Sequence, residues 1–138
     1  MRRCGLLIVV IVLAIASVGC AGVRGPDEKA LIMELIENWK AAAEEGDIDG
    51  LMVLYSRDFV GEQGETYDSL EKQLAHLLPM LEAYGVSYDT ADVALQIHNG
   101  EAVAGPLLMR AMGRTTPMDF TLAKENGAWL ITATESTL

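Results

Sequence analysis

Cysteine and positive charge are both scarce in this 138-residue chain. The two cysteines, Cys4 and Cys20, fall within the first twenty residues, so the rest of the chain has no thiol for a disulfide bond or for nucleophilic catalysis. Ten Lys and Arg stand against twenty Asp and Glu, which gives a formal net charge of −10. Without a basic run or patch, the chain is not expected to bind nucleic acid. The negative charge would also repel anionic lipid headgroups.

The sequence also lacks the short motifs that indicate a cofactor or a reaction. It has no Gly-x-Ser-x-Gly nucleophile motif, phosphate-binding loop or dinucleotide fingerprint. The two histidines, His76 and His98, are not at the i, i+4 spacing of a helical metal site, and no acidic cluster joins them. The segment Asp47-Ile48-Asp49-Gly50 is similar to the start of a calcium loop, but the later ligands are missing and helix capping explains it. We therefore expect neither a metal ion nor a cofactor.

The first twenty residues have the pattern of a secretory signal. Arg2 and Arg3 precede an apolar run over residues 6–16, and small residues follow up to Cys20. The apolar run is shorter than the roughly 20 residues that a helix needs to span a bilayer. A cleaved signal is therefore favoured over a permanent membrane anchor.

The segment Ser17-Val18-Gly19-Cys20-Ala21 resembles a bacterial lipobox, although Ser17 stands where leucine is usual. The resemblance implies that residues 1–19 are a lipoprotein signal peptide, that cleavage precedes Cys20, and that this cysteine carries diacylglyceryl and further acyl groups such as palmitate. Two or more chains anchor a protein stably. Residues 20–25 would then be a lipidated tether that holds the domain over residues 26–138 at the cell envelope, outside the cytoplasm. Ala21 favours the outer membrane in a cell with two membranes; an ordinary secretory signal and an uncleaved anchor are the alternatives.

The first half of the region after the tether has helical periodicity and the second half does not. A first helix is expected to begin at Pro26, because proline suits the first turn, and to end at Gly46 as a C-terminal cap. Its apolar face consists of Ile32, Leu35, Ile36, Trp39 and Ala43. Asp47 should cap a second helix over residues 48–55, and a short strand is expected at residues 59–60.

A third helix is expected to begin near Asp68, which has capping-box spacing to Glu71. Its buried stripe is made of leucines: Leu70, Leu74, Leu77, Leu78 and Leu81. Pro79 removes one backbone donor and clashes with the preceding turn, so we expect a kink or a split there.

The chain then changes to the two-residue alternation of strands. Residues 93–98 alternate apolar and polar side chains, and Asn99-Gly100 is a typical two-residue hairpin turn. A strand over residues 101–112 follows, and Gly105-Pro106 inside it predicts a bulge or bend.

Residues 113–117 are expected to form a loop, and a last hairpin should join residues 118–125 to residues 128–134 around Asn126-Gly127. The order is thus three helices followed by an antiparallel meander. The predicted fold class is α+β, a cone-shaped roll in which three N-terminal helices pack on a bent, mostly antiparallel sheet.

At two places the sequence resembles the nuclear transport factor 2-like superfamily, which includes SnoaL-like proteins and ketosteroid isomerases. One is the run WKAAAEEGDIDGLMVLYSRDF from Trp39 to Phe59, and the other is the closing hairpin around Lys124 to Ile131. The resemblance implies a cystatin-like fold with a conical pocket between the long helix and the concave sheet, and a homodimer through the outer sheet face. The superfamily hosts enzymes, binding proteins and assembly domains alike, so the fold alone implies no activity.

The ketosteroid isomerase pattern is only partly present. Trp39 stands where that family has its oxyanion-stabilising tyrosine, and indole donates a hydrogen bond without being a comparable acid. The general-base position falls near Gln63, with Glu62 one residue earlier. Asp119 falls on the second oxyanion position, but it alternates with apolar neighbours and can equally face water. Asp119 and Glu62 are therefore the candidate catalytic residues.

Seven residues are expected to line the pocket: Trp39, Tyr55, Phe59, His76, Met109, Asp119 and Trp129. The favoured function is a non-catalytic domain that binds a small apolar molecule in the cone, or a protein partner at the envelope. The alternatives are an isomerase, cyclase or dehydratase, and a structural dimerisation module. An enzyme requires an acid inside the pocket, so the direction in which Asp119 points separates these hypotheses.

Overall fold

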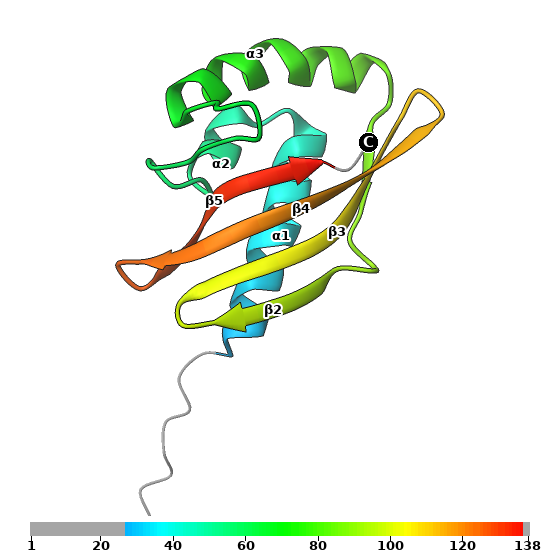
Figure 1. Cartoon of the computed structure of the whole chain (residues 1–138). Coiled ribbons are helices and arrows are strands. Elements are labelled where there is room, and N and C mark those ends of the chain that lie inside the picture. Colours follow the sequence, from blue (N-terminus) through cyan, green and yellow to red (C-terminus); the bar gives the residue numbers. More distant parts are fainter. Residues whose placement is uncertain (1–26, 137–138) are drawn as a thin grey trace, which may run out of the picture.

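The structure is a computed structural model that describes residues 27–136 (Figure 1). The expected signal peptide, Cys20 and the tether lie outside the described residues. The element order is α1 (Glu28–Glu45), α2 (Ile48–Met52), α3 (Tyr67–Ala83), β1 (Ser87–Asp89), β2 (Ala94–His98), β3 (Glu101–Ala111), β4 (Arg114–Glu125) and β5 (Ala128–Ser136). No helix of this part of the chain is both long and apolar enough to cross a membrane.

Helix α1 ends at the predicted cap, Gly46, but begins at Glu28, two residues after the predicted start at Pro26. The Asp27 side chain accepts a hydrogen bond from the Lys29 amide, and Gly46 takes the left-handed conformation, with φ of 67°, that favours glycine. The helix buries the five residues of the predicted apolar face together with Ala42. Figure 1 shows α1 crossing one face of the sheet, so this apolar stripe and the sheet enclose the core.

Helix α3 begins one residue earlier than predicted and has a different cap. Thr66 and Ser69 form the capping box, not Asp68 and Glu71, because Thr66 has the extended backbone that an N-cap requires. Of the kink or split predicted at Pro79, the split does not occur, since α3 continues as one helix to Ala83.

The five strands lie in one antiparallel sheet, in the order β1-β3-β4-β5. Strands β1 and β2 pair with different parts of the same edge of β3. The register of β3 with β4 shifts between Ala104 and Leu107, where Gly105-Pro106 lies, so the predicted bulge is confirmed. The Asn99-Gly100 and Asn126-Gly127 turns also lie where predicted. The α+β roll predicted from the sequence is confirmed.

Two local predictions are wrong, and one strand was not predicted. Residues 114–117 belong to β4, and a turn at Met112-Gly113 replaces the expected loop. Residues 59–60 form no strand; Val60 makes a single bridge to Thr66. Strand β1 was not expected, because three residues are too few to show an alternation.

Candidate ligand-binding site

An apolar cavity of about 130 Å³ lies between α1, α3 and the concave face of the sheet. Helix α3 contributes a leucine stripe at helical spacing, made of Leu70, Leu74, Leu77, Leu78 and Leu81. Met109, Met118 and Thr134 contribute one side chain each from β3, β4 and β5. Alternate residues of a strand face opposite sides of a sheet, and the side chains of these three residues lie on the side that α1 covers. The methionine side chains make part of this wall adaptable.

A buried hydrogen-bonded pair supplies the polar part of the cavity wall. The Trp39 indole Nε1 donates to the Tyr55 hydroxyl oxygen at 2.8 Å, and both side chains line the cavity. Trp39 and Tyr55 are 4% and 6% exposed, respectively. Edge-to-face contacts with Phe120 and Phe59 orient the two rings. Burial raises the pKa of Tyr55 well above its usual range, against the smaller lowering effect of the Trp39 hydrogen bond.

Tyr88 on β1 is a second tyrosine on the cavity wall. Its ring packs edge-on against Trp39, with centroids 5.0 Å apart, and its amide donates to Glu44 on α1. Burial, followed by the negative charge of Glu44, raises the pKa of Tyr88 to about 12. Both tyrosines therefore stay protonated and uncharged at neutral pH.

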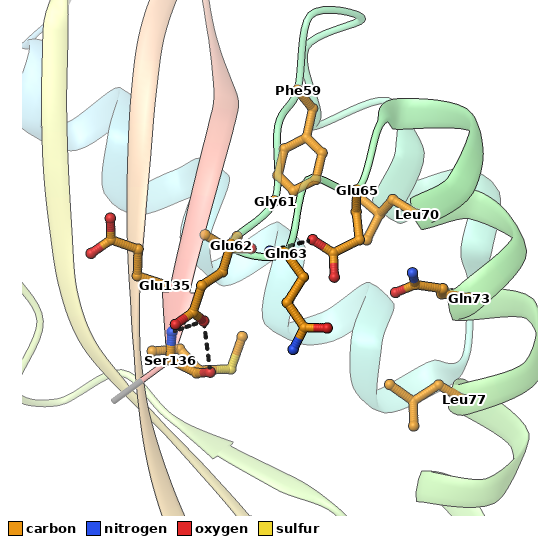
Figure 2. A pocket seen from close by; sticks show the side chains of 12 residues that line it. Phe59, Gly61, Glu62, Gln63, Glu65, Leu70, Gln73, Leu77, Glu135 and Ser136 are labelled. Atoms are coloured by element: carbon orange, nitrogen blue, oxygen red, sulfur yellow. Dashed lines mark hydrogen bonds between the residues drawn. The ribbon is translucent and has the colours of Figure 1, made fainter. Parts of the chain in front are cut away.

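A second, more polar pocket of about 300 Å³, called the mouth below, lies beside the cavity (Figure 2). The two spaces share Leu70, Leu77, Met118 and Thr134 as walls. Carboxylates surround the mouth, from Glu62, Glu65 and Glu135. The Glu62 Oε2 atom accepts hydrogen bonds from the amide and the hydroxyl of Ser136, each at 3.4 Å, and so ties the loop after α2 to the end of β5.

The structure brings four of the seven predicted pocket residues to this site. Trp39, Tyr55 and Met109 line the cavity, and Phe59 lines the mouth. Glu62, the second catalytic candidate, lies at the rim and is exposed, so it is not inside the cone.

His76 and Trp129 line neither the cavity nor the mouth. His76 is exposed, because it lies about 200° around α3 from Leu74 and therefore faces away from the cavity. The Trp129 indole donates to Glu28 at the opposite end of α1, where Lys124 also pairs with that carboxylate. The helical spacing of the leucines already indicated that His76 faces away from the cavity.

Asp119 faces the outer side of the sheet. Its neighbours Phe120 and Met118 point to the core and the cavity, which turns Asp119 outward. Its carboxylate lies over Gly105 on β3, where a Cβ atom would come within 1.7 Å of Asp119 Oδ1. Asp119 therefore cannot stabilise an oxyanion in the cone, and its placement among the pocket residues is wrong.

The cavity carries no group of obvious acid–base or metal chemistry. Within residues 27–136, no carboxylate, imidazole or amine lines the inner cavity, and no three His, Cys, Asp or Glu side chains gather as metal ligands. Sequence reasoning missed Tyr88 and Thr134. The strand carrying Tyr88 is too short to recognise, whereas the alternation of β5 could have identified Thr134.

Comparisons with known proteins establish the fold but no activity. A nuclear transport factor 2-like protein of unknown function from Pseudomonas putida is 16% identical, with a TM-score of 0.67 over 82% of this chain and 89% of that one. An uncharacterised protein with a cystatin-like fold from Caulobacter vibrioides is 14% identical, with a TM-score of 0.68 over 79% and 87%. A protein of unknown function with a cystatin-like fold from Nostoc punctiforme is 18% identical, with a TM-score of 0.64 over 78% and 88%.

The sequence itself matches no known family profile and no curated protein. The structural matches nevertheless agree with one another and span most of each chain. The chain has the nuclear transport factor 2-like, cystatin-like fold that the motifs around Trp39 and Lys124 predicted.

Proposed function

We propose that this protein is an extracytoplasmic lipoprotein, anchored by acyl chains on Cys20, whose domain binds a small apolar molecule in the cone without converting it. The observation that carries the binding function is the apolar cavity between α1, α3 and the sheet, which shares four wall residues with the acidic mouth. Pockets for small molecules are typically concave and mostly apolar, with a few polar groups. The hydrogen-bonded pair of Trp39 and Tyr55 is such a polar group in the wall of this cavity.

The lining of the cavity supports binding over catalysis. The enzyme hypothesis required an acid inside the cone, and Asp119 lies on the outer face while Glu62 lies at the rim. The inner wall within the described residues offers only hydroxyl and indole groups for hydrogen bonding. These groups hold and orient a ligand, whereas general acid–base catalysis needs a group whose pKa lies near the working pH.

Native mass spectrometry of the membrane-extracted protein tests the binding function. We expect a retained small molecule that is lost when Leu77→Trp places an indole between mouth and cavity. Ala75→Trp is the matched control, because Ala75 is exposed on α3 and lines neither space. Retention of the same molecule by both variants, or no small molecule on the wild-type protein, would contradict the proposal and favour an envelope protein partner or a structural dimer.

Labelling with radioactive palmitate in the host tests the anchor. We expect label in the wild-type protein and none in Cys20→Ser. Cys4→Ser is the matched control and should keep the label, because Cys4 lies in the segment that cleavage removes. Equal labelling of all three proteins would contradict acylation at Cys20.

A further inference from the structure

The Tyr55 hydroxyl has a proton without an acceptor. Its oxygen already accepts from Trp39, and an indole nitrogen is a donor only, so the Tyr55 proton cannot be shared with Trp39. No other residue from 27 to 136 accepts a hydrogen bond from this hydroxyl. Tyr55 is only 6% exposed, and its side chain lines the cavity, which a ligand could enter. A buried donor without an acceptor is unfavourable, and a ligand that supplies an acceptor relieves this.

The charges around the site restrict the ligand further. No cationic side chain lines the cavity or its mouth in the described part of the chain, whereas three carboxylates surround the mouth. A ligand carboxylate or phosphate would thus be repelled on entry and would find no counter-ion inside. A hydrocarbon would enter but would leave the Tyr55 proton unpaired.

We infer that the cone selects an uncharged, mostly apolar ligand carrying one oxygen acceptor, a carbonyl or ether, which receives the hydrogen bond of the Tyr55 hydroxyl. This inference rests on the proposed binding function and names the class of ligand. Trp39 acts as a positioning residue: by donating to the Tyr55 oxygen it occupies one lone pair and turns the O–H away from itself. The leucines of α3 and the two methionines enclose the rest of the ligand.

Acetophenone and ethylbenzene form a matched pair of probes, because they differ mainly in a carbonyl replacing a methylene group. Binding of each to the full-length lipoprotein is measured by equilibrium dialysis against micelles without protein. We expect acetophenone to bind about threefold to tenfold more tightly, which is the range of one net hydrogen bond. Benzoate, the anionic counterpart, should not bind.

The matched variants are Trp39→Phe and the double variant Trp39→Phe/Tyr55→Phe, which differ from each other only in the Tyr55 hydroxyl. The double variant also avoids leaving an unpaired indole N–H that could itself bind the ketone. We expect Trp39→Phe to weaken the preference for acetophenone, because the Tyr55 O–H is no longer oriented, and the double variant to lose it.

A second measurement needs no variant. Acetophenone should shift the NMR signal of the Trp39 indole N–H, which is bonded to the Tyr55 oxygen, and should leave the Trp129 indole signal unchanged because Trp129 bonds Glu28 outside the cavity. Equal affinity for acetophenone and ethylbenzene, a preference that survives in the double variant, or tight binding of benzoate would overturn the inference while leaving the binding function intact. Failure of both neutral probes to bind would overturn both.

Discussion

Replacing Tyr55 with phenylalanine removes one oxygen atom and leaves the ring and its packing in place. The change deprives the Trp39 indole of its acceptor, 2.8 Å away, in a site where both residues are less than a tenth exposed. A buried donor that loses its partner destabilises the folded state by about 1–3 kcal/mol. Since 1 kcal/mol lowers the Tm of a domain of roughly this size by about 4–8 °C, Tyr55→Phe should lower Tm by about 4 °C or more.

Urea unfolding followed by circular dichroism measures this change. The midpoint should fall while the m-value stays constant, because the surface exposed on unfolding is unchanged. Tyr88→Phe is the control, since the Tyr88 hydroxyl makes no hydrogen bond with residues 27–136, and it should change the free energy of unfolding by less than about 0.5 kcal/mol.

Adding Trp39→Phe closes a double-mutant cycle on the pair. The double variant no longer contains an unpaired indole, so its loss of stability should be smaller than the sum of the two single losses by about 0.5–3 kcal/mol. Additive losses would refute the reasoning, because they would mean that the indole and the hydroxyl stabilise the fold independently. Equal losses in Tyr55→Phe and Tyr88→Phe would refute it as well.

Three further predictions concern the sheet and the ionisable groups. Gly105→Ala should destabilise the domain by about 1–3 kcal/mol, because its Cβ would overlap Asp119 Oδ1, and Asp119→Ala should restore part of the loss in urea unfolding. The hydrogen bond from Lys124, followed by that from Trp129, lowers the pKa of Glu28. The ionised Glu28 carboxylate therefore stabilises the fold above the usual carboxyl pKa, and this stabilisation is lost as pH falls through the lowered pKa. Glu28→Gln should accordingly flatten the acid limb of a plot of Tm against pH. Burial raises the pKa of Tyr88 to about 12, so stability should fall between about pH 10 and 12 as the unfolded chain releases its proton first, and Tyr88→Phe should lessen that fall.

Elements with long, regular patterns and clear ends were predictable from the sequence. The stripe of α1 recurs over eighteen residues between Asp27 and Gly46, and both caps use the residue types that such ends favour. The hairpins at Asn99-Gly100 and Asn126-Gly127 lie at positive φ, which asparagine and glycine tolerate. The residue types at these caps and turns determine the local backbone conformation, and tertiary contacts do not change it.

Pro117 shows where local reasoning fails. Proline has no amide to donate and usually argues against an inner strand, and residues 113–117, which end at Pro117, were expected to form a loop. In the structure Pro117 lies in β4 opposite Leu108, one residue before the described pairing of β4 with β5 begins at Met118 opposite Ser136. The pairing of β4 with β3 places the proline in a strand, and strand pairing is a tertiary property.

The candidate site also has one part that was predictable from the sequence and one part that was not. That Trp39 faces inward follows from helical phase, but its hydrogen bond reaches Tyr55, sixteen positions away and just after α2, where Tyr55 bridges to Ile131. The packing of α1 against this segment decides whether the indole N–H reaches the phenol oxygen, and neither periodicity nor capping specifies that packing. Since the pairing of these two groups determines which proton faces the cavity, the chemistry that the site can recognise is set by helix packing and not by the residue types alone.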